Sequence, residues 1–261
     1  MTLDDGLVDE MRSAGVLLLE GVIDAATLQA VRDAVEEQRS REALSRVLES
    51  GGKHVRAIHG GHREDDRLAQ LVAHPRLLDP ARQLLDDEVY LYQFKVNLKE
   101  AFGGAAWPWH QDFAFRHRQD AMPEPRALSI ALFLDDVTPA NGPMMFLQGS
   151  HREGLIPTRG DRDGQWTDDV SADLTFTLEN EQVRELAVKY PTVAPTGCAG
   201  SLLLFHPNIV HASVGNISPD PRAMAIVTYN AMSNVPSSPS KRPEFLVSRE
   251  AVAIGSPGTA Q

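Results

Sequence analysis

The chain has 261 residues, 42% hydrophobic and 23% charged, which is the balance of an ordinary globular protein. Its formal net charge of -11 argues against a nucleic-acid partner, because phosphate binding needs concentrated lysine and arginine. No run approaches the roughly 20 apolar residues that cross a bilayer, and the acidic start lacks the order of a signal peptide. The lone Cys198 excludes an internal disulfide or a cysteine-ligated metal cage. We therefore expect a cytoplasmic protein without membrane association.

The first third of the sequence predicts mostly helices. A helix is expected to begin after Asp24, a suitable N-cap residue, and to run to about Gln38. A break between two later helices is expected at His74-Pro75, since a residue before proline avoids helical geometry. The other elements expected in this part are a strand at 15–19 and helices at 68–73 and 77–85.

Short strands are expected from about Val89 onward. Residues 90–98 alternate aromatic or apolar with polar side chains, the period-two pattern of a half-buried strand. Turn-forming clusters such as 139–143 separate the later candidates, which favours an antiparallel sandwich or barrel over a parallel sheet. Those later strands are expected at 127–134, 144–147, 173–177, 201–205 and 224–229.

Three segments are expected to lie outside this barrel. Residues 157–173, rich in glycine, aspartate and arginine, predict an excursion from it. Residues 235–243 and 255–261 predict mobile segments, unless they cover a site.

His110 and Asp112 are the most informative pair. In an extended strand side chains alternate, so both would point to the same face and present a nitrogen and an oxygen to a common point. Taken alone, such a pair favours a plain surface hydrogen bond. His211, after an apolar strand, changes this, because two histidines and one carboxylate form the facial triad of non-heme iron(II) oxygenases. His206 competes as the second imidazole, but Pro207 follows it and the local pattern favours His211.

Arg222 follows His211 at the start of the last expected strand. An arginine fork pairs bidentately with a carboxylate, so this residue suits the distal carboxylate of 2-oxoglutarate. The plain alternative is a surface arginine at the beginning of a strand.

From about Val89 to Asn230 the sequence resembles the phytanoyl-CoA dioxygenase superfamily, and within it ectoine hydroxylases and related small-molecule hydroxylases. Segments 15–19 and 55–59 also look like this family, so the resemblance covers most of the chain. The segments that carry it are YQFKVN at 92–97, WHQD at 109–112, RALS at 126–129, NGP at 141–143, QGSH at 148–151, and His211 through Asn216 to Arg222.

The resemblance implies a mainly β fold with flanking α-helices, built on a double-stranded β-helix (jelly-roll, cupin-like) core. We accordingly expect a single domain over 1–261, with a mostly helical part at 1–88, the core at 89–232 and a C-terminal extension at 233–261. The resemblance further implies Fe(II), 2-oxoglutarate and O2 as cofactors. It places the metal on His110, Asp112 and His211, and 2-oxoglutarate on Gln93, Asn97, Ser129 and Arg222, with Trp107 beside it.

The expected reaction is hydroxylation of an unactivated C–H bond with release of succinate and CO2. Related halogenases have a small residue at the position of Asp112, which frees a coordination site for chloride, so a carboxylate there implies hydroxylation. The acidic composition and the ectoine-hydroxylase-like segments favour a small polar molecule, such as a free amino acid or a related cyclic compound. A natural-product intermediate is an alternative substrate.

Substrate contacts are less well defined by the sequence. Lys95 stands where many relatives carry a basic residue, and Phe113, Arg116 and Arg118 follow the metal motif, where an arginine could hold a substrate carboxylate. A solvated basic loop is the plain alternative for this stretch. Rival functions are a metal-dependent hydrolase or isomerase on a cupin-like barrel and a non-catalytic binding module. The protein is expected to be a monomer or a homodimer.

Overall fold

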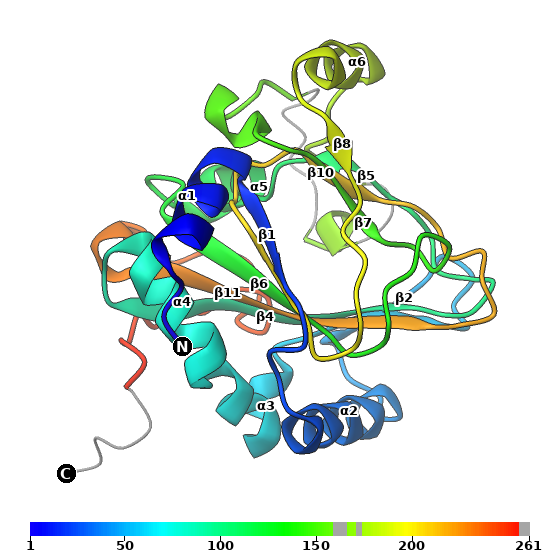
Figure 1. The fold of residues 1–261 in the computed structure, drawn as a ribbon. Coiled ribbons are helices and arrows are strands. Elements are labelled where there is room, and N and C mark those ends of the chain that lie inside the picture. Colours follow the sequence, from blue (N-terminus) through cyan, green and yellow to red (C-terminus); the bar gives the residue numbers. More distant parts are fainter. Residues whose placement is uncertain (159–165, 171–173, 256–261) are drawn as a thin grey trace.

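Two antiparallel sheets face each other in a jelly roll (Figure 1). The computed structural model describes residues 1–158, 166–170 and 174–255. The larger sheet has the strand order β1-β9-β6-β11-β4-β3-β2, and the smaller sheet has the order β5-β10-β7-β8. The strands are β1 (Val16–Leu19), β2 (Arg46–Leu48), β3 (Val55–His59), β4 (Val89–Lys99), β5 (Trp107–His110), β6 (Ala127–Phe133), β7 (Met144–Leu147), β8 (Thr192–Val193), β9 (Leu202–Phe205), β10 (His211–Ser213) and β11 (Arg222–Ala231).

The larger sheet is covered on both faces, as strand β6 shows. All seven of its residues are buried. Ile130 and Leu132 pack with residues of the helices, whereas Ala131 and Phe133 pack with residues of the smaller sheet. Because side chains alternate along a strand, a sheet covered on both sides reads as a continuous apolar run. The uninterrupted hydrophobicity of this segment therefore reflects its central place in the fold.

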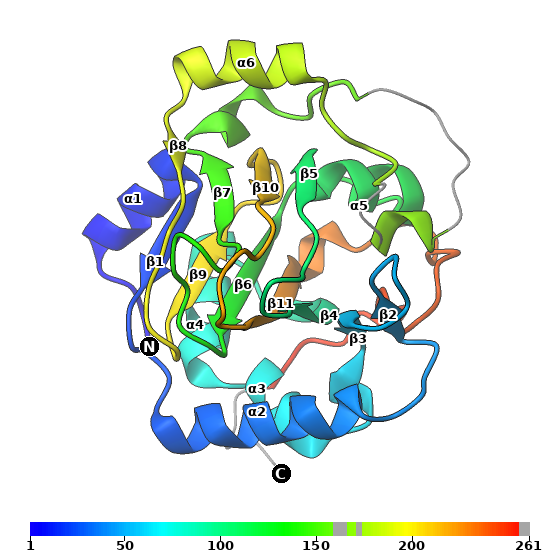
Figure 2. The ribbon, with the colours of Figure 1, turned by 90° about the vertical axis from the view of Figure 1, so that its right-hand side faces the viewer.

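Helices cover the outer face of the larger sheet. Helices α2 and α3 lie along this side, while α6 lies at the opposite end of the molecule, beyond β8 (Figure 2). Helix α2 begins where expected, since the Asp24 carboxylate accepts hydrogen bonds from the N–H groups of Ala26 and Thr27. The helices are α1 (Asp5–Ala14), α2 (Ala25–Arg39), α3 (Asp66–Val72), α4 (Pro75–Leu85), α5 (Asp112–Asp120) and α6 (Asn180–Lys189), with short 3-10 helices at Gly61–Arg63, Ser150–Glu153, Asp168–Val170 and Met232–Asn234.

Most predicted elements are confirmed, including the helix break at His74-Pro75, but the strand expected at 173–177 is wrong. Residues 174–177 pair with no strand, and residue 173 lies outside the described residues. Leu174 and Phe176 do alternate in burial, but they pack against Ala114 and Phe115 of helix α5. The alternation thus reflects packing on a helix and not strand pairing.

The other segments that were expected outside the barrel are described in part. Much of the excursion expected over 157–173 lies outside the described residues, and so do residues 256–261. Residues 235–243 pack onto the molecule beside helix α5, where Arg242 pairs with Asp120. Among the described residues, no helix has the length and apolar character needed to span a bilayer.

Candidate active site

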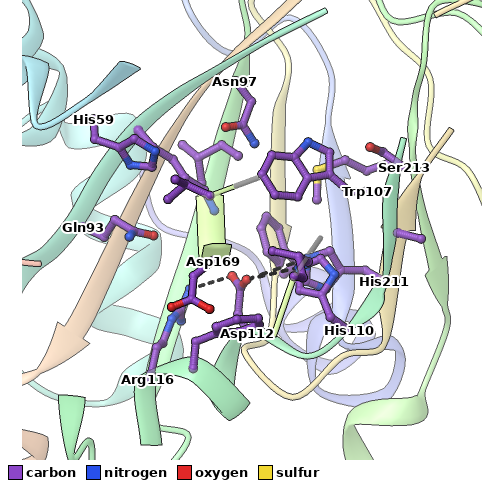
Figure 3. Close-up of a pocket in the computed structure, with 18 of the residues that line it drawn as sticks. His59, Gln93, Asn97, Trp107, His110, Asp112, Arg116, Asp169, His211 and Ser213 are labelled. Atoms are coloured by element: carbon purple, nitrogen blue, oxygen red, sulfur yellow. Dashed lines mark hydrogen bonds and ion pairs between the residues drawn. The ribbon is translucent and has the colours of Figure 1, made fainter. Parts of the chain in front are cut away.

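The smaller sheet and helix α5 bring the predicted metal ligands together. His110 ends β5 and pairs in register with His211, which begins β10, and Asp112 begins α5. Asp112 Oδ1 lies 3.7 Å from His110 Nε2 and 3.9 Å from His211 Nε2 (Figure 3). One ligand atom from each residue falls within 4.8 Å of the others. These positions suit three ligands of a single metal ion.

Asp112 reaches this position from a helix, and the sequence-based argument that placed it in an extended strand is wrong. The strand ends at His110, and Gln111 is the extended N-cap residue with φ -118° and ψ 128°. One extended residue suffices to keep the two-residue alternation, so Asp112 still faces the histidines. A carboxylate in the first turn also suits the positive end of the helix dipole. Gln111 points the other way and donates to the carbonyl oxygens of Gly154 and Asn208.

Backbone contacts orient both imidazoles. His110 Nδ1 lies 2.7 Å from the carbonyl oxygen of Pro108, and His211 Nδ1 lies 3.1 Å from that of Ile209. A carbonyl only accepts, so each Nδ1 carries the hydrogen and each Nε2 keeps its lone pair toward the other ligands. Burial, together with the neighbouring His211, lowers the pKa of His110 to about 3, and burial lowers the pKa of His211. Both rings are therefore neutral at physiological pH, as metal binding requires.

The third ligand is held as a carboxylate. Burial opposes the charge on Asp112, but Arg116 and Lys95 outweigh it and hold the pKa of Asp112 below its ordinary value. Arg116 Nη2 donates to Asp112 Oδ2 at 2.7 Å, which leaves Oδ1 as the oxygen nearest the histidines. Two neutral imidazoles and one carboxylate oxygen fit a divalent iron site that keeps open positions for exogenous ligands.

The same cavity contains four of the five residues predicted to contact 2-oxoglutarate. Gln93 and Asn97 line it from β4, Trp107 from β5 and Arg222 from the start of β11. Arg222 is only 2% exposed and donates from Nη2 to the carbonyl oxygen of Gly142. Burial lowers its pKa to about 10, so it remains a cation at neutral pH. Because these four residues line one cavity, that cavity is a candidate site for a bound oxoacid.

Ser129, the fifth of these residues, does not line the cavity. Its hydroxyl is fully buried and lies 3.0 Å from both Arg116 Nη2 and Thr228 Oγ1. In this structure it therefore contacts a cavity residue, and its contact with 2-oxoglutarate stays a prediction.

The predicted substrate residues are divided by the structure. Lys95 and Arg116 line the cavity. Phe113 is buried in an apolar cluster and does not line the cavity, and Arg118 is exposed with Nη1 donating to Thr158, so a substrate role for these two stays a prediction. Residues 113–118 lie in helix α5 and include the buried Arg116, so the alternative of a solvated basic loop is wrong.

Two cavity residues, Arg242 and Asp169, carried no signal in the sequence, whereas His59 belongs to a cluster that could border the pocket. Arg242 reaches the cavity from the C-terminal extension, and Asp169 from a short 3-10 helix next to undescribed residues. His59 lines it from β3, and burial lowers its pKa to about 3. Neither Arg242 nor Asp169 stands beside the metal motif in sequence, so only the tertiary fold brings them there. Residues 235–243 were expected either to be mobile or to cover a site, and the position of Arg242 agrees with the second expectation.

A jelly roll with two histidines and a carboxylate around one cavity defines a mononuclear metal enzyme of the oxygenase type. The sequence pattern of the family "Phytanoyl-CoA dioxygenase (PhyH)" matches residues 11–224. The chain belongs to this family, as its resembling segments indicated.

Similar proteins act on small molecules. The chain is 42% identical over 245 residues to L-proline trans-4-hydroxylase of Streptomyces griseoviridis, covering 92% of this chain and 91% of that protein. It is 38% identical over 243 residues to ectoine dioxygenase of Sphingopyxis alaskensis, covering 90% and 79%. The crystal structure of EctD from S. alaskensis with 2-oxoglutarate and 5-hydroxyectoine superposes with a TM-score of 0.84 at 33% identity, covering 97% of this chain and 86% of that one. A structure of the same protein with bound Fe gives a TM-score of 0.82.

Proposed function

We propose that this protein is an iron(II)- and 2-oxoglutarate-dependent dioxygenase that hydroxylates a free amino acid or a related cyclic compound and releases succinate and CO2. The observation that carries the proposal is the convergence of His110, Asp112 and His211 on a cavity that also holds the buried cation of Arg222. A hydrolase or isomerase with the same ligands has no need for a buried arginine suited to an oxoacid.

Each of these residues has a chemical role in the proposal. His110 and His211 would supply neutral nitrogens, and Asp112 one anionic oxygen, to a single iron(II). When bound with 2-oxoglutarate and dioxygen, the iron supplies the oxidising power that breaks an unactivated C–H bond. Arg222 would pair with the distal carboxylate of 2-oxoglutarate and so fix its orientation. Gln93, Asn97 and Trp107 would line the cavity around 2-oxoglutarate and exclude water from it.

L-proline is the preferred candidate substrate, and ectoine is the second. The L-proline trans-4-hydroxylase resembles this chain over nearly the whole length of both proteins, and ectoine dioxygenases resemble it at lower identity. Lys95 supports a carboxylate-bearing substrate, because it lines the cavity and makes no hydrogen bond or ion pair with the described part of the chain. A substrate carboxylate would supply its missing partner.

The test is a coupled assay with purified protein, iron(II), 2-oxoglutarate, oxygen and either L-proline or ectoine. We expect succinate and a product heavier by one oxygen atom in equal amounts, and neither from the Asp112→Ala variant. Anaerobic addition of iron(II) and 2-oxoglutarate should give a visible charge-transfer absorption. Absence of this band at full metal loading would favour the hydrolase, and a band without coupled product would exclude both substrates.

The proposed setting of this reaction is the cytoplasm, with a monomer or a homodimer as the active form. Size-exclusion chromatography with light scattering distinguishes the two, and a larger assembly contradicts the proposal.

A further inference from the structure

Arg116 has an unusual position between the metal ligand and the cavity. It lies one turn after Asp112 on helix α5 and is only 2% exposed. Its Nη2 donates to Asp112 Oδ2 at 2.7 Å and to Ser129 Oγ at 3.0 Å. Thr228 Oγ1 stands 3.5 Å from the same nitrogen. One side of the guanidinium is thus fully engaged with the protein.

The other side of the guanidinium is buried without a partner. Arg116 Nη1 is shielded from solvent and makes no hydrogen bond to any described residue. Arg116 is also among the residues that line the cavity, where it lies beside Asp112 (Figure 3). Buried charged donors are rarely left unpaired, because burial removes the water that would otherwise solvate them. An unpaired donor on a residue that lines the cavity therefore points to a partner on the bound molecule.

The charges around the cavity indicate that this group is an anion. Among the described residues, the charged ones that line it are Lys95, Arg116, Arg222, Arg242, Asp112 and Asp169. Arg242 is already paired with Asp120, and Arg222 is the candidate partner of 2-oxoglutarate. Arg116 contacts Asp112 with Nη2 only, and Lys95, which acts on Asp112 through its charge, makes no hydrogen bond with a described residue. Lys95 and Arg116 Nη1 thus leave cationic donors on the described wall of the cavity that a carboxylate on the bound molecule would pair with, whereas Asp169 already accepts a hydrogen bond from Gln119 Nε2.

We propose that Arg116 links the metal ligand to the substrate, an inference that rests on the proposed function. Nη2 holds Asp112 Oδ2 away from the metal, so that Asp112 coordinates through Oδ1 alone. Nη1 binds the carboxylate of the amino acid substrate. The planar, rigid fork of arginine can make both contacts at once, whereas the ammonium of lysine is a single point charge on a flexible stem. Arg116 would therefore be both a positioning residue for the metal site and a specificity residue for carboxylate-bearing substrates.

The experiment compares wild type with Arg116→Gln and Arg116→Lys. Iron(II) affinity is measured anaerobically from the visible band formed with 2-oxoglutarate, without any substrate. Carboxylate selection is measured as the ratio of kcat/KM for L-proline to that for L-prolinamide, which lacks the anionic charge. We expect Arg116→Gln to weaken iron(II) binding about 10- to 100-fold, the range found when partners of metal ligands are removed. We expect the acid-to-amide ratio to fall at least about tenfold in the same variant. Arg116→Lys keeps the positive charge but can contact only one of the two groups. We therefore expect this variant to keep either the wild-type iron(II) affinity or the wild-type acid-to-amide ratio, but not both.

Arg67→Gln is the matched control. Arg67 also pairs with carboxylates, those of Asp65 and Glu37, but it does not line the cavity, so both properties should stay at wild-type values. Wild-type iron(II) affinity in Arg116→Gln would overturn the positioning role. An unchanged acid-to-amide ratio would overturn the substrate contact while wild type still hydroxylates L-proline. Wild type that converts neither L-proline nor ectoine excludes both substrates, and the iron(II) measurement still decides the positioning role.

Discussion

The guanidinium of Arg56 lies over the indole ring of Trp107, with Cζ 3.7 Å from the ring centroid. Arg56 is on β3 and is 2% exposed, and Glu49 accepts a hydrogen bond from its Nη1 at 2.9 Å. Nη2 donates to the carbonyl oxygen of Ala106, next to the tryptophan. These contacts tie the β2–β3 hairpin to the cavity wall at the start of β5.

Arg56→Met should therefore affect both stability and cofactor binding. Removing one partner of a buried ion pair costs about 3–5 kcal/mol, because Glu49 is left without its cation. The loss of the cation–π contact should also loosen Trp107 and raise the KM for 2-oxoglutarate several-fold. Urea denaturation and steady-state kinetics measure the two effects. Arg39→Met, which breaks a partly exposed pair with Glu100, is the control and should leave the KM unchanged.

His110→Ala and His211→Ala should each abolish metal binding without unfolding the protein. Each variant removes one of three ligands, and two ligands hold iron(II) too weakly for turnover. We expect succinate formation to fall by more than about 100-fold and the visible band with 2-oxoglutarate to disappear. His117→Ala, an exposed histidine of helix α5, serves as the control. Retained band intensity in either ligand variant would remove that histidine from the metal site.

Arg222→Ala should chiefly weaken 2-oxoglutarate binding. A hydrogen bond to a charged group contributes about 1.5–3 kcal/mol, which corresponds to an increase in Kd of roughly 10- to 100-fold. Arg222→Lys should recover part of this loss, since it keeps the charge but not the fork. Titration with 2-oxoglutarate under anaerobic conditions measures the change, and an unaltered Kd in Arg222→Ala would place the oxoacid elsewhere.

The contrast between Arg222 and Arg116 shows how far the sequence predicts this site. Arg222 was predicted because it follows a candidate ligand at the start of a strand, a relation that lies within one stretch of chain. The helix that brings Arg116 next to Asp112 was not predicted, because residues 110–112 were expected to lie in an extended strand. Arg242 could not be predicted at all, since its partner Asp120 lies far away in sequence.

The half-buried His206 should make the metal-free protein less stable in acid. Its Nδ1 accepts a hydrogen bond from the N–H of Asn208, and burial lowers its pKa to about 4 from an ordinary 6.5. Between these values the unfolded state binds the proton more readily, so stability is complete above about pH 6.5 and is lost as the pH falls toward 4. The loss from this residue is at most about 1.4 kcal/mol per pH unit.

His206→Asn tests this contribution, because asparagine keeps an acceptor for Asn208 but does not titrate. We expect the free energy of unfolding to fall less between pH 6.5 and pH 5 in the variant than in wild type. Urea denaturation at both pH values measures the difference. An identical pH dependence in the two proteins would show that His206 does not contribute.

Asp120 anchors the C-terminal extension to helix α5. Arg242 Nε donates to Asp120 Oδ1 at 2.9 Å, and a second contact joins Nη2 to Oδ2. The hydroxyl groups of Tyr92 and Ser240 also donate to this carboxylate, which is 1% exposed. The pair thus fixes Arg242 at the wall of the cavity.

Asp120→Asn should release this arginine and lower both stability and substrate affinity. An amide cannot neutralise the guanidinium, and a buried charge left without its counter-ion costs about 3–5 kcal/mol. Arg242 would also lose its fixed place at the cavity wall, so the KM for the amino acid should rise while that for 2-oxoglutarate stays constant. Glu244→Gln is the control in the same extension, because its pair with Arg63 is exposed and worth no more than about 1 kcal/mol. Equal stability losses in the two variants would show that the Asp120–Arg242 pair does not hold the extension in place.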